Sequence, residues 1–226
     1  MTVLYHPELI QGSEEWFEQR RGTLTASEMK LIITPAKLQY ASNEKERTHL
    51  YELASQRITK FVEPHYIGDD MLRGMDDELD AKRYYEDNFS RVTDCGFIAN
   101  DRWGFVLGYS PDGLVGEDGL IECKGRRAKF QLQTIIEDKV PEEYMIQLQT
   151  GLLVSERKWI DFISFCGGMP MYVVRVFHDD VIQKAIVEAA KIFHEKLDKM
   201  IATYNDRMKV GKWVQTERRI TGDIIL

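Results

Sequence analysis

A short part of the chain combines a turn and a strand that both carry charged side chains. Asp112 lies in the turn sequence Ser110-Pro-Asp-Gly, and Glu122 and Lys124 follow in a segment, 120–124, with the composition of a strand. Residues two apart on a strand point to the same face, and hairpin pairing would bring Asp112 alongside Glu122. Two carboxylates and one ammonium on a common surface can hold Mg²⁺ and organise an attacking water. The spacing therefore predicts a metal-dependent nuclease site.

Each of these residues also has a structural explanation. Ser-Pro-Asp-Gly is a favoured β-turn sequence, so Asp112 could serve the turn alone. Glu122 and Lys124 could form a structural ion pair, but a buried pair is a weak source of stability. A carboxylate in a central strand is costly without a partner. The three residues together favour chemistry.

Two more polar residues fall on predicted helices. Glu78 shares a helix face with the apolar residue Tyr85, and a carboxylate on such a face needs a partner. A metal ion near Asp112 and Glu122 would provide that partner. The alternative is that Glu78 lies at the edge of the apolar face, where its carboxylate reaches solvent. Gln147 lies on a later helix, where an amide usually bonds to nearby backbone but could orient a water or a phosphate.

A candidate anion site lies near the start of the chain. Arg20 is close to the end of a helix that begins after Ser13, and Ser27 lies in the capping-box sequence Thr25-Ala-Ser-Glu28. The box predicts the first turn of a second helix, where free N–H groups attract anions. Arg20 and Ser27 could therefore form a pocket for a terminal phosphate. Ordinary helix capping is the alternative.

The charge balance restricts how the chain could bind nucleic acid. Its 226 residues carry 37 acidic and 30 basic side chains, a net charge of −7. A protein that grips DNA only through its phosphates is usually basic, whereas a nuclease concentrates carboxylates at its site. Positive charge gathers directly after the strand at 120–124, at these residues: Lys124, Arg126, Arg127 and Lys129. Such a run fits a nuclease, although it is also common on solvated surfaces.

Composition favours a globular protein of the cytoplasm. The chain is 43% hydrophobic and 30% charged, and no stretch approaches the roughly 18 apolar residues of a membrane span. The first residues lack the basic and apolar regions of an export signal. Three widely spaced cysteines without a C-x-x-C pair indicate reduced thiols.

Hydrophobic periodicity and breaker residues predict an α/β protein with helices on both sides of a sheet. The expected helices lie at about 13–22, 25–35, 43–58, 70–89, 127–138, 141–154 and 179–210. The expected strands lie at 95–99, 103–109, 120–124, 159–165 and 171–177. Because no repeat or linker divides the chain, we expect a single domain over residues 1–226.

Together the motifs resemble the phage lambda exonuclease family, the alkaline exonucleases of phage recombination systems. The likeness runs from Trp16 to about Phe177 and rests on five motifs in this order: Trp16-x-x-x-Arg20-x-Gly22 with Thr25-Ala-Ser27-Glu28, Gly74-x-x-x-Glu78, Ser110-Pro-Asp112-Gly113-Leu114, Glu122-Cys-Lys124, and Tyr144-x-x-Gln147-x-Gln149. The resemblance implies a restriction-endonuclease-like fold, a mixed central sheet flanked by helices on both sides.

The resemblance also implies a metal site. Asp112, Glu122 and the carbonyl group of Cys123 would bind Mg²⁺, and Glu78 would help to hold a second Mg²⁺ ion, with Mn²⁺ as a possible substitute. Lys124 would polarise the water that attacks the phosphodiester.

Other positions match family residues that orient the site or bind the 5′-phosphate. Gln147 matches a residue that orients the catalytic apparatus, and Arg20, Ser27 and Ser110 match residues of the 5′-phosphate site. A basic family residue that contacts this phosphate falls on Phe130 here. Its role would therefore pass to one of three neighbours: Arg126, Arg127 and Lys129.

The activity implied is a Mg²⁺-dependent, processive 5′-to-3′ exonuclease. It would digest one strand of linear double-stranded DNA to mononucleotides and leave 3′ single-stranded overhangs for recombination. The family acts as a ring-shaped homotrimer with a phage single-strand annealing protein, in the cytoplasm of the bacterial host. Helices within 13–60 would form part of the DNA site. The alternatives are a structure-specific or restriction-type endonuclease of the same fold and a non-catalytic DNA-binding subunit.

Overall fold

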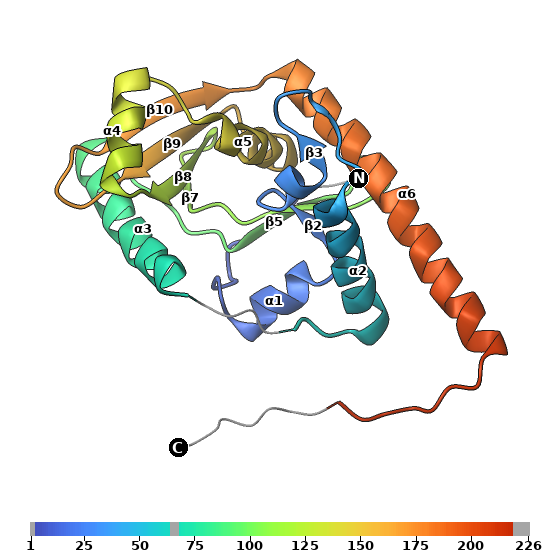
Figure 1. The fold of residues 1–226 in the computed structure, drawn as a ribbon. Helices are drawn as coiled ribbons and strands as arrows, with labels where there is room; N and C mark the ends of the chain where they lie inside the picture. The colour runs from blue at the N-terminus through green and yellow to red at the C-terminus, as the bar shows by residue number, and fades with distance from the viewer. Residues whose placement is uncertain (1–2, 64–67, 219–226) are drawn as a thin grey trace.

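Two four-stranded sheets form the centre of the computed structural model, which describes residues 3–63 and 68–218 (Figure 1). The helices are α1 (Glu14–Arg20), α2 (Glu44–Thr59), α3 (Asp69–Asn88), α4 (Ala128–Glu137), α5 (Glu142–Ser155), α6 (Asp180–Val210) and the 3-10 helix η1 (Met29–Leu31). The strands are β1 (Val3–His6), β2 (Leu24–Thr25), β3 (Ile33–Thr34), β4 (Gln39–Tyr40), β5 (Phe97–Asn100), β6 (Leu107–Tyr109), β7 (Gly113–Val115), β8 (Gly119–Gly125), β9 (Trp159–Phe165) and β10 (Tyr172–Phe177).

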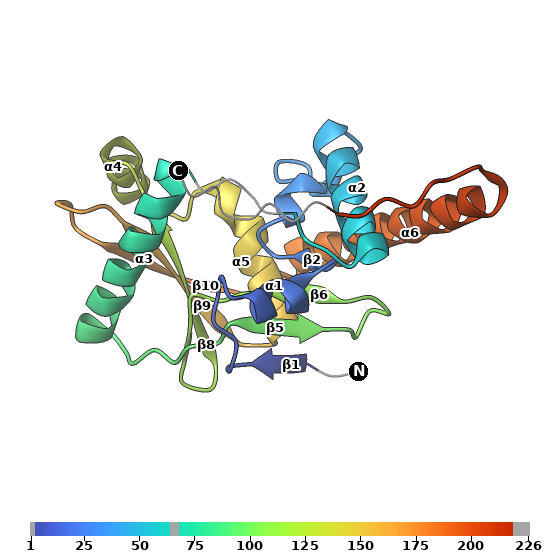
Figure 2. The same ribbon diagram turned by 90° about the horizontal axis from the view of Figure 1, so that it is seen from below.

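Both sheets mix parallel and antiparallel pairs. The first has the order β10-β9-β8-β7, in which β8 and β9 run parallel and the other neighbours run antiparallel. The second has the order β1-β5-β6-β2, in which β2 runs parallel to β6 and Thr25 pairs with Gly108. Helices α3 and α5 cover opposite faces of the first sheet (Figure 2). The expected mixed α/β fold of the restriction-endonuclease type is confirmed.

Strand β8 separates two apolar clusters because its side chains alternate. Ile121 and Cys123 pack with Ala81 and Tyr85 of α3. Leu120 belongs to the main core, which also contains residues of α2, α5 and α6. Glu122 therefore faces the α5 side of the sheet, where an unpaired carboxylate would be costly.

The helix expected at 25–35 is wrong. Thr25 belongs to β2, and only the short 3-10 helix η1 follows before β3 begins at Ile33. The capping-box contact itself is present, because the Glu28 carboxylate accepts from the Thr25 backbone N–H at 3.0 Å. Tertiary structure ends the helix after this turn: Ile32 and Ile33 are buried, and Ile33 pairs with β4. Ser27 therefore does not lie in the first turn of an α-helix.

Most of the other expected elements are present with small shifts at their ends. Asn43 caps α2 by accepting from the Glu46 N–H, and Asp179 caps α6. The strand expected at 103–109 is shorter, since β6 begins only at Leu107. Strands β1 and β7 were not expected. Both are so short that the alternation of apolar and polar residues along them is too brief to predict a strand.

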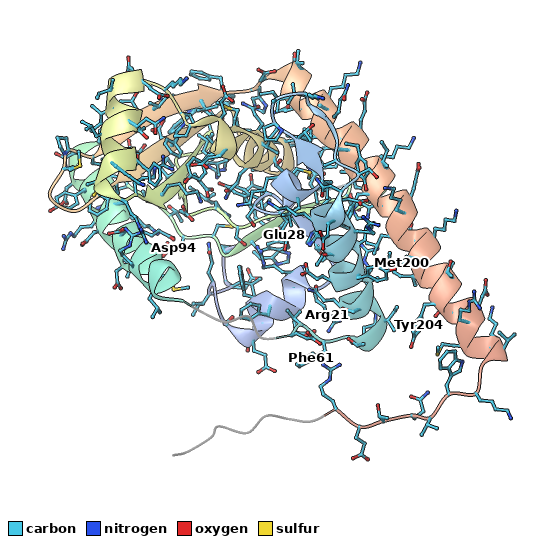
Figure 3. The ribbon with its side chains drawn as sticks, in the orientation of Figure 1. Arg21, Glu28, Phe61, Asp94, Met200 and Tyr204 are labelled. Carbon is cyan, nitrogen blue, oxygen red and sulfur yellow. The ribbon has the colours of Figure 1, made fainter. Side chains whose placement is uncertain are left out.

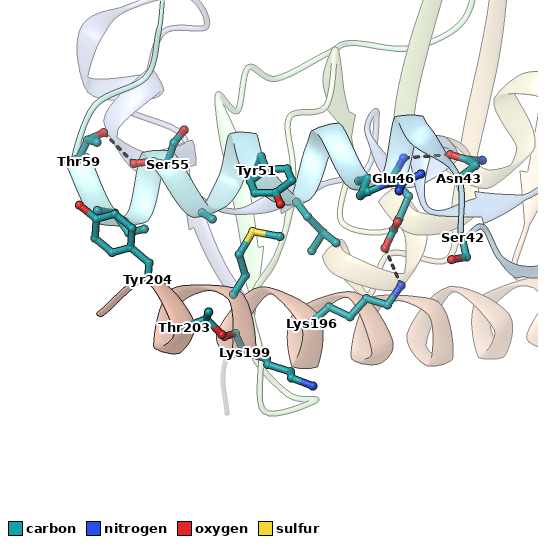
Figure 4. Close-up of a pocket in the computed structure, with 15 residues that line it drawn as sticks. Ser42, Asn43, Glu46, Tyr51, Ser55, Thr59, Lys196, Lys199, Thr203 and Tyr204 are labelled. Atoms are coloured by element: carbon teal, nitrogen blue, oxygen red, sulfur yellow. Dashed lines mark hydrogen bonds and ion pairs between the residues drawn. The ribbon is translucent and has the colours of Figure 1, made fainter. Parts of the chain in front are cut away.

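The long helix α6 packs against α2 and α5 and then extends beyond them (Figures 1 and 2). Between α6 and α2 lies a groove of about 800 Å³, with Leu50, Met200 and Tyr204 among its lining residues (Figure 4). None of the helices in the described ranges is both long and apolar enough to cross a membrane.

Phe193 tests how far the fold depends on α6. Its side chain is fully buried and stacks on His49 of α2, with ring centroids 5.6 Å apart. We expect Phe193→Ala to lower the free energy of unfolding by about 3–5 kcal/mol, because it leaves a cavity in the core. The exposed Val210 supplies the control, and Val210→Ala should change stability by less than about 0.5 kcal/mol. Urea denaturation measures both, and a loss below about 1 kcal/mol for Phe193→Ala would contradict the assignment.

Candidate active site

Glu122 is the centre of the polar cluster on the α5 side of the sheet. Its side chain is about 2% exposed. Atom Oε1 accepts hydrogen bonds from Lys124 Nζ at 2.6 Å and Gln147 Nε2 at 2.5 Å. Atom Oε2 accepts from the Tyr109 hydroxyl group at 2.8 Å. Three different elements, β8, α5 and β6, therefore hold this carboxylate in one orientation.

Asp112 reaches the same corner of the sheet through the β7–β8 hairpin. Gly113 pairs with Ile121 in the antiparallel register, so the preceding residue, Asp112, lies beside the next part of β8. Its Oδ2 atom accepts from the backbone N–H of Cys123 at 2.6 Å. The expected hairpin pairing of this turn with the Glu-x-Lys strand is present.

Glu78 joins this corner from α3. Its carboxyl group lies near that of Asp112, close enough for each to act on the pKa of the other. On the helix face that Glu78 shares, Tyr85 is buried as an apolar neighbour, whereas Met75, one turn before Glu78, is half exposed.

Crowding of these carboxyl groups shifts their pKa values upward. Burial raises the pKa of Asp112 well above its usual value, and the charges of Glu122 and Glu78 raise it further. Burial and the charge of Glu122 also raise the pKa of Glu78. Each shift has the same physical cause: a charged carboxylate is less favourable where water is displaced and another negative charge is near.

Lys124 is the cation that offsets this negative charge. Burial alone would lower its pKa, but the Glu122 and Asp112 carboxylates outweigh burial and raise the pKa. The ammonium group therefore stays protonated, with its donors directed at the acidic cluster. It also lies 5.7 Å from the centre of the Tyr144 ring.

The acidic cluster has the right ligand chemistry for a hard cation, since carboxylate oxygens are the ligands that Mg²⁺ and Mn²⁺ prefer. However, among residues 3–63 and 68–218 no three His, Cys, Asp or Glu side chains already stand in an arrangement that would hold a metal ion. Protein donors occupy part of the Glu122 carboxylate, since Oε1 accepts two hydrogen bonds and Oε2 accepts one. The second lone pair of Oε2 is the site that a cation could take without displacing Lys124 or Gln147.

Tyr109 is a site residue that the sequence did not reveal. It ends β6, is buried, and donates to Glu122 from 13 positions away along the chain. Gly151 of α5 makes room for it: a Cβ atom at Gly151 would lie 2.8 Å from the Tyr109 ring. The absence of a side chain at Gly151 therefore lets the ring pass beneath α5 and reach Glu122.

A second polar cluster forms around Arg20 and Ser110. Arg20 Nη1 donates to Ser110 Oγ at 2.8 Å, and the single Trp16 Nε1–H is shared between the Gly96 carbonyl oxygen at 2.9 Å and Ser110 Oγ at 3.1 Å. A hydroxyl oxygen has two lone pairs and one hydrogen. Since Ser110 Oγ accepts from Arg20 and shares the Trp16 N–H, its own hydrogen is available to be donated outward. An acceptor such as a phosphate oxygen is the natural partner for this group.

Trp16 also supports the Arg20 guanidinium group, which lies 4.2 Å from the centre of the indole ring. Burial lowers the pKa of Arg20, and the nearby charge of Glu28 partly restores it. The structure therefore brings Arg20 and Ser110 together as the sequence suggested. Ser27 joins through Thr25, whose hydroxyl oxygen lies 3.3 Å from Ser27 Oγ.

The three basic residues after β8 are not equivalent. Arg126 is buried, and its Nη1 atom donates to Glu143 and to the Tyr144 hydroxyl group. Lys129 is exposed and lies over the Phe130 ring, 4.7 Å from its centre. Arg127 precedes α4 and is also exposed. The bonds of Arg126 direct it towards α5, so Arg127 and Lys129 are the better placed of the three to reach a ligand in solvent.

The groove of about 800 Å³ between α2 and α6 does not coincide with this cluster. The groove between α2 and α6 is lined by none of the predicted site residues. Its lining contains one carboxylate, that of Glu46. This carboxylate is already paired with Lys196 at 2.9 Å. We therefore place the candidate active site at the polar cluster of β6, β8 and α5.

The chain is similar to known nucleases in sequence and in structure. The family model described as a YqaJ-like viral recombinase domain matches residues 15–158, a range that includes every predicted site residue. The crystal structure of an alkaline exonuclease (LHK-Exo) from Laribacter hongkongensis is 30% identical, with a TM-score of 0.77 over 87% of this chain and 98% of that chain. A structure of LHK-Exo in complex with dAMP gives the same values.

A more distant likeness extends the fold comparison. A phage related exonuclease from Haemophilus somnus 129PT is 12% identical, with a TM-score of 0.59 over 80% of this chain and 96% of that chain. At this identity the likeness concerns the fold alone. Among curated proteins, none matches the chain.

The raised pKa values of Asp112 and Glu78 predict how stability depends on pH. A group whose folded-state pKa is raised binds more protons in the folded state, so stability is lost as pH rises through that pKa. The extra stability is complete below the unfolded value of about 4. In EDTA, we therefore expect the melting temperature to fall as pH rises above this point, with at most about 1.4 kcal/mol lost per pH unit for each proton.

Asp112→Asn should flatten this pH dependence, because the amide does not titrate. The matched control is Glu117→Gln, an exposed carboxyl group on the turn of the same hairpin, which should keep the wild-type slope. Differential scanning fluorimetry from pH 4 to 9 measures all three proteins. Equal slopes for Asp112→Asn and the wild type would contradict the electrostatic account.

Proposed function

Because the chain belongs to the YqaJ-like viral recombinase family, we propose that it is a Mg²⁺-dependent exonuclease that digests one strand of linear double-stranded DNA from its 5′ end. Membership of this family supports a nuclease activity. The metal, the direction, the substrate and the products are the parts that we propose. The whole chain would act as one nuclease domain, with segments within residues 13–60 at the DNA end.

One observation carries this proposal: the Arg20–Ser110 cluster, whose donors suit a terminal phosphate, adjoins the acidic cluster. Residues Tyr109 to Asp112 form one continuous segment, in which Tyr109 holds Glu122 and Ser110 is held by Arg20. The hydrogen of Ser110 is available to be donated outward, so it favours an acceptor-rich group over a 5′-hydroxyl group. A 5′-phosphate bound at Ser110 would place the first phosphodiester of the strand near Asp112.

The carboxylates near this point would hold the metal. Asp112, Glu122, Glu78 and the backbone carbonyl group of Cys123 are the proposed ligands, and two Mg²⁺ ions per site, or Mn²⁺ in their place, fit the number of oxygens. The bound metal would supply Lewis acidity, which lowers the pKa of a water and neutralises charge on the departing oxygen. Relief of the crowding between Asp112 and Glu78 is a further reason for a cation to bind there.

The chain's own residues would orient the reaction. Lys124 would hold the attacking water with its ammonium group, and Gln147 and Tyr109 would keep the Glu122 carboxylate in place. The water oxygen would form a bond to phosphorus while the bond from phosphorus to the 3′-oxygen of the terminal nucleotide breaks. The water would lose a proton to solvent, and the departing 3′-oxygen would take one up from solvent. The product strand then carries a new 5′-phosphate, which can enter the pocket for the next cycle.

The remaining elements of the proposal concern products and partners. The complex of LHK-Exo with dAMP supports mononucleotide products. Digestion of one strand leaves a 3′ single strand, on which a phage single-strand annealing protein would load for recombination. A homotrimeric ring around the DNA would keep the enzyme on its substrate, in the cytoplasm of the bacterial host.

End-labelled duplexes test the direction and the role of the pocket. With Mg²⁺ we expect the 5′ label to be released first, as a mononucleotide, and no release in EDTA. A 5′-hydroxyl end should be digested at least about tenfold more slowly than a 5′-phosphate end, since it loses charge-assisted hydrogen bonds. Glu122→Gln should be inactive on every substrate.

Three outcomes would count against the proposal. Release of the 3′ label first would reverse the direction, and cleavage of closed circular DNA would identify an endonuclease of the same fold. Equal rates on the two 5′ ends would remove the terminal-phosphate pocket.

A further inference from the structure

Gly125 ends β8 at the point where α3 lies against the strand. It is on the same face of β8 as Ile121 and Cys123, which pack against α3. A Cβ atom at Gly125 would lie 2.6 Å from Oδ2 and 2.8 Å from Cβ of Asp77, the residue before Glu78. Helix α3 can therefore lie this close to the end of β8 because Gly125 has no side chain.

The end of β8 is held in place from the side of β9. Gly125 pairs with Phe165 in the parallel register, and the backbone N–H of Arg126 donates to the Phe165 carbonyl oxygen at 2.6 Å. Strand β9 is in turn paired with β10 along its other edge. A side chain at Gly125 would therefore displace α3 and not the strand.

The C-terminal half of α3 is anchored to the rest of the molecule. The hydroxyl group of Tyr85 donates to the buried Asp161 of β9 at 2.6 Å. Lys82 forms an ion pair with Asp94, a residue that Figure 3 shows beside α3. The N-terminal half has weaker support, since Leu72 is half exposed and the N-cap of α3 makes no side-chain hydrogen bond. A displacement of the N-terminal half would therefore tilt the helix about this anchor.

The displacement is large on the scale of metal coordination. Ordinary contact begins at 3.4 Å, so a Cβ atom at Gly125 and the Cβ atom of Asp77 would have to separate by about 0.6 Å. Distances in a metal site hold to within about 0.2 Å, and Mg²⁺ requires nearly ideal octahedral geometry. A shift of this size would withdraw the Glu78 carboxylate from an ion that it holds near Asp112.

We propose that Gly125 is a positioning residue, which sets how closely α3 approaches β8 and thereby lets Glu78 help to hold the second cation. Asp112 and Glu122 come from the β7–β8 hairpin and its preceding turn, so the ion that they hold should not depend on Gly125. The inference rests on the proposed two-cation site and adds to it the residue that admits one of the ligands.

Titration of the protein with Mn²⁺ in a calorimeter, without DNA, measures both ions. The wild type should bind two Mn²⁺ ions per chain. Gly125→Ala should weaken the second ion at least about tenfold, a typical effect of disturbing the support of a metal ligand, and the first by no more than about twofold. The matched control is Gly167→Ala in the β9–β10 turn, where a Cβ atom meets nothing within 4 Å. It should bind both ions as the wild type does.

A second substitution at Asp77 should restore the site. Asp77→Gly in the Gly125→Ala protein removes every atom of Asp77 that the new methyl group would meet, so the second ion should bind again. Asp77→Gly alone should bind two ions. Loss of the second ion from that single variant would make Asp77 itself a ligand and would overturn the inference. Where Gly125→Ala alone does not fold by circular dichroism, the double variant carries the test, and it should fold and bind two ions.

The pattern of binding separates a positioning role from a merely structural one. Equal weakening of both ions in Gly125→Ala, or no weakening of the second, would overturn the inference, and so would a double variant that does not regain the second ion. If the wild type binds fewer than two ions, the proposed two-cation site is wrong and the inference fails with it. If the wild type binds two and Gly125→Ala binds them equally well, only the role of Gly125 is wrong.

Discussion

Three carboxyl groups share one largely buried corner of the molecule with a single lysine, and this crowding is the constraint on which the site depends. Burial and the neighbouring carboxylates raise the pKa values of Asp112 and Glu78, protein donors hold Glu122, and Lys124 offsets only part of the negative charge. Burying like charges together costs free energy that packing alone does not return. Such an arrangement is expected where a divalent cation is part of the working state.

The fold creates this corner by bringing together the ends of several elements. The β7–β8 hairpin sets Asp112 beside Cys123, and α5 contributes Gln147 from the other side. The parallel pairing of β2 with β6 then places Thr25 near Ser110, so the anion pocket and the acidic cluster are fixed to one another through a four-residue segment. A shift of β6 would therefore disturb both clusters.

The sequence predicts those parts of the site that depend on local periodicity. Glu122 and Lys124 share a face because they are two apart on a strand, and the Asp112 turn lies just before the strand with which it pairs. Tyr109, Trp16 and Thr25 could not be found in this way, since their roles come from contacts with residues distant in the chain, such as Trp16 with Ser110.

The error at 25–35 has the same origin. The capping box is a true local signal, and its Glu28–Thr25 contact forms. Strand pairing of Thr25 with Gly108 and of Ile33 with Tyr40 then overrides helix propensity. Motif order, by contrast, gave the fold class correctly, because it reflects the arrangement of the whole family.

Binding of Mn²⁺, measured by electron paramagnetic resonance without any DNA, tests the central claim most directly. The account predicts that the wild type binds Mn²⁺ and that Asp112→Asn and Glu122→Gln each weaken binding at least about tenfold, while Glu117→Gln binds as the wild type does. Unchanged Mn²⁺ affinity in both Asp112→Asn and Glu122→Gln would contradict it, because the crowded carboxyl groups would then have no part in holding a cation.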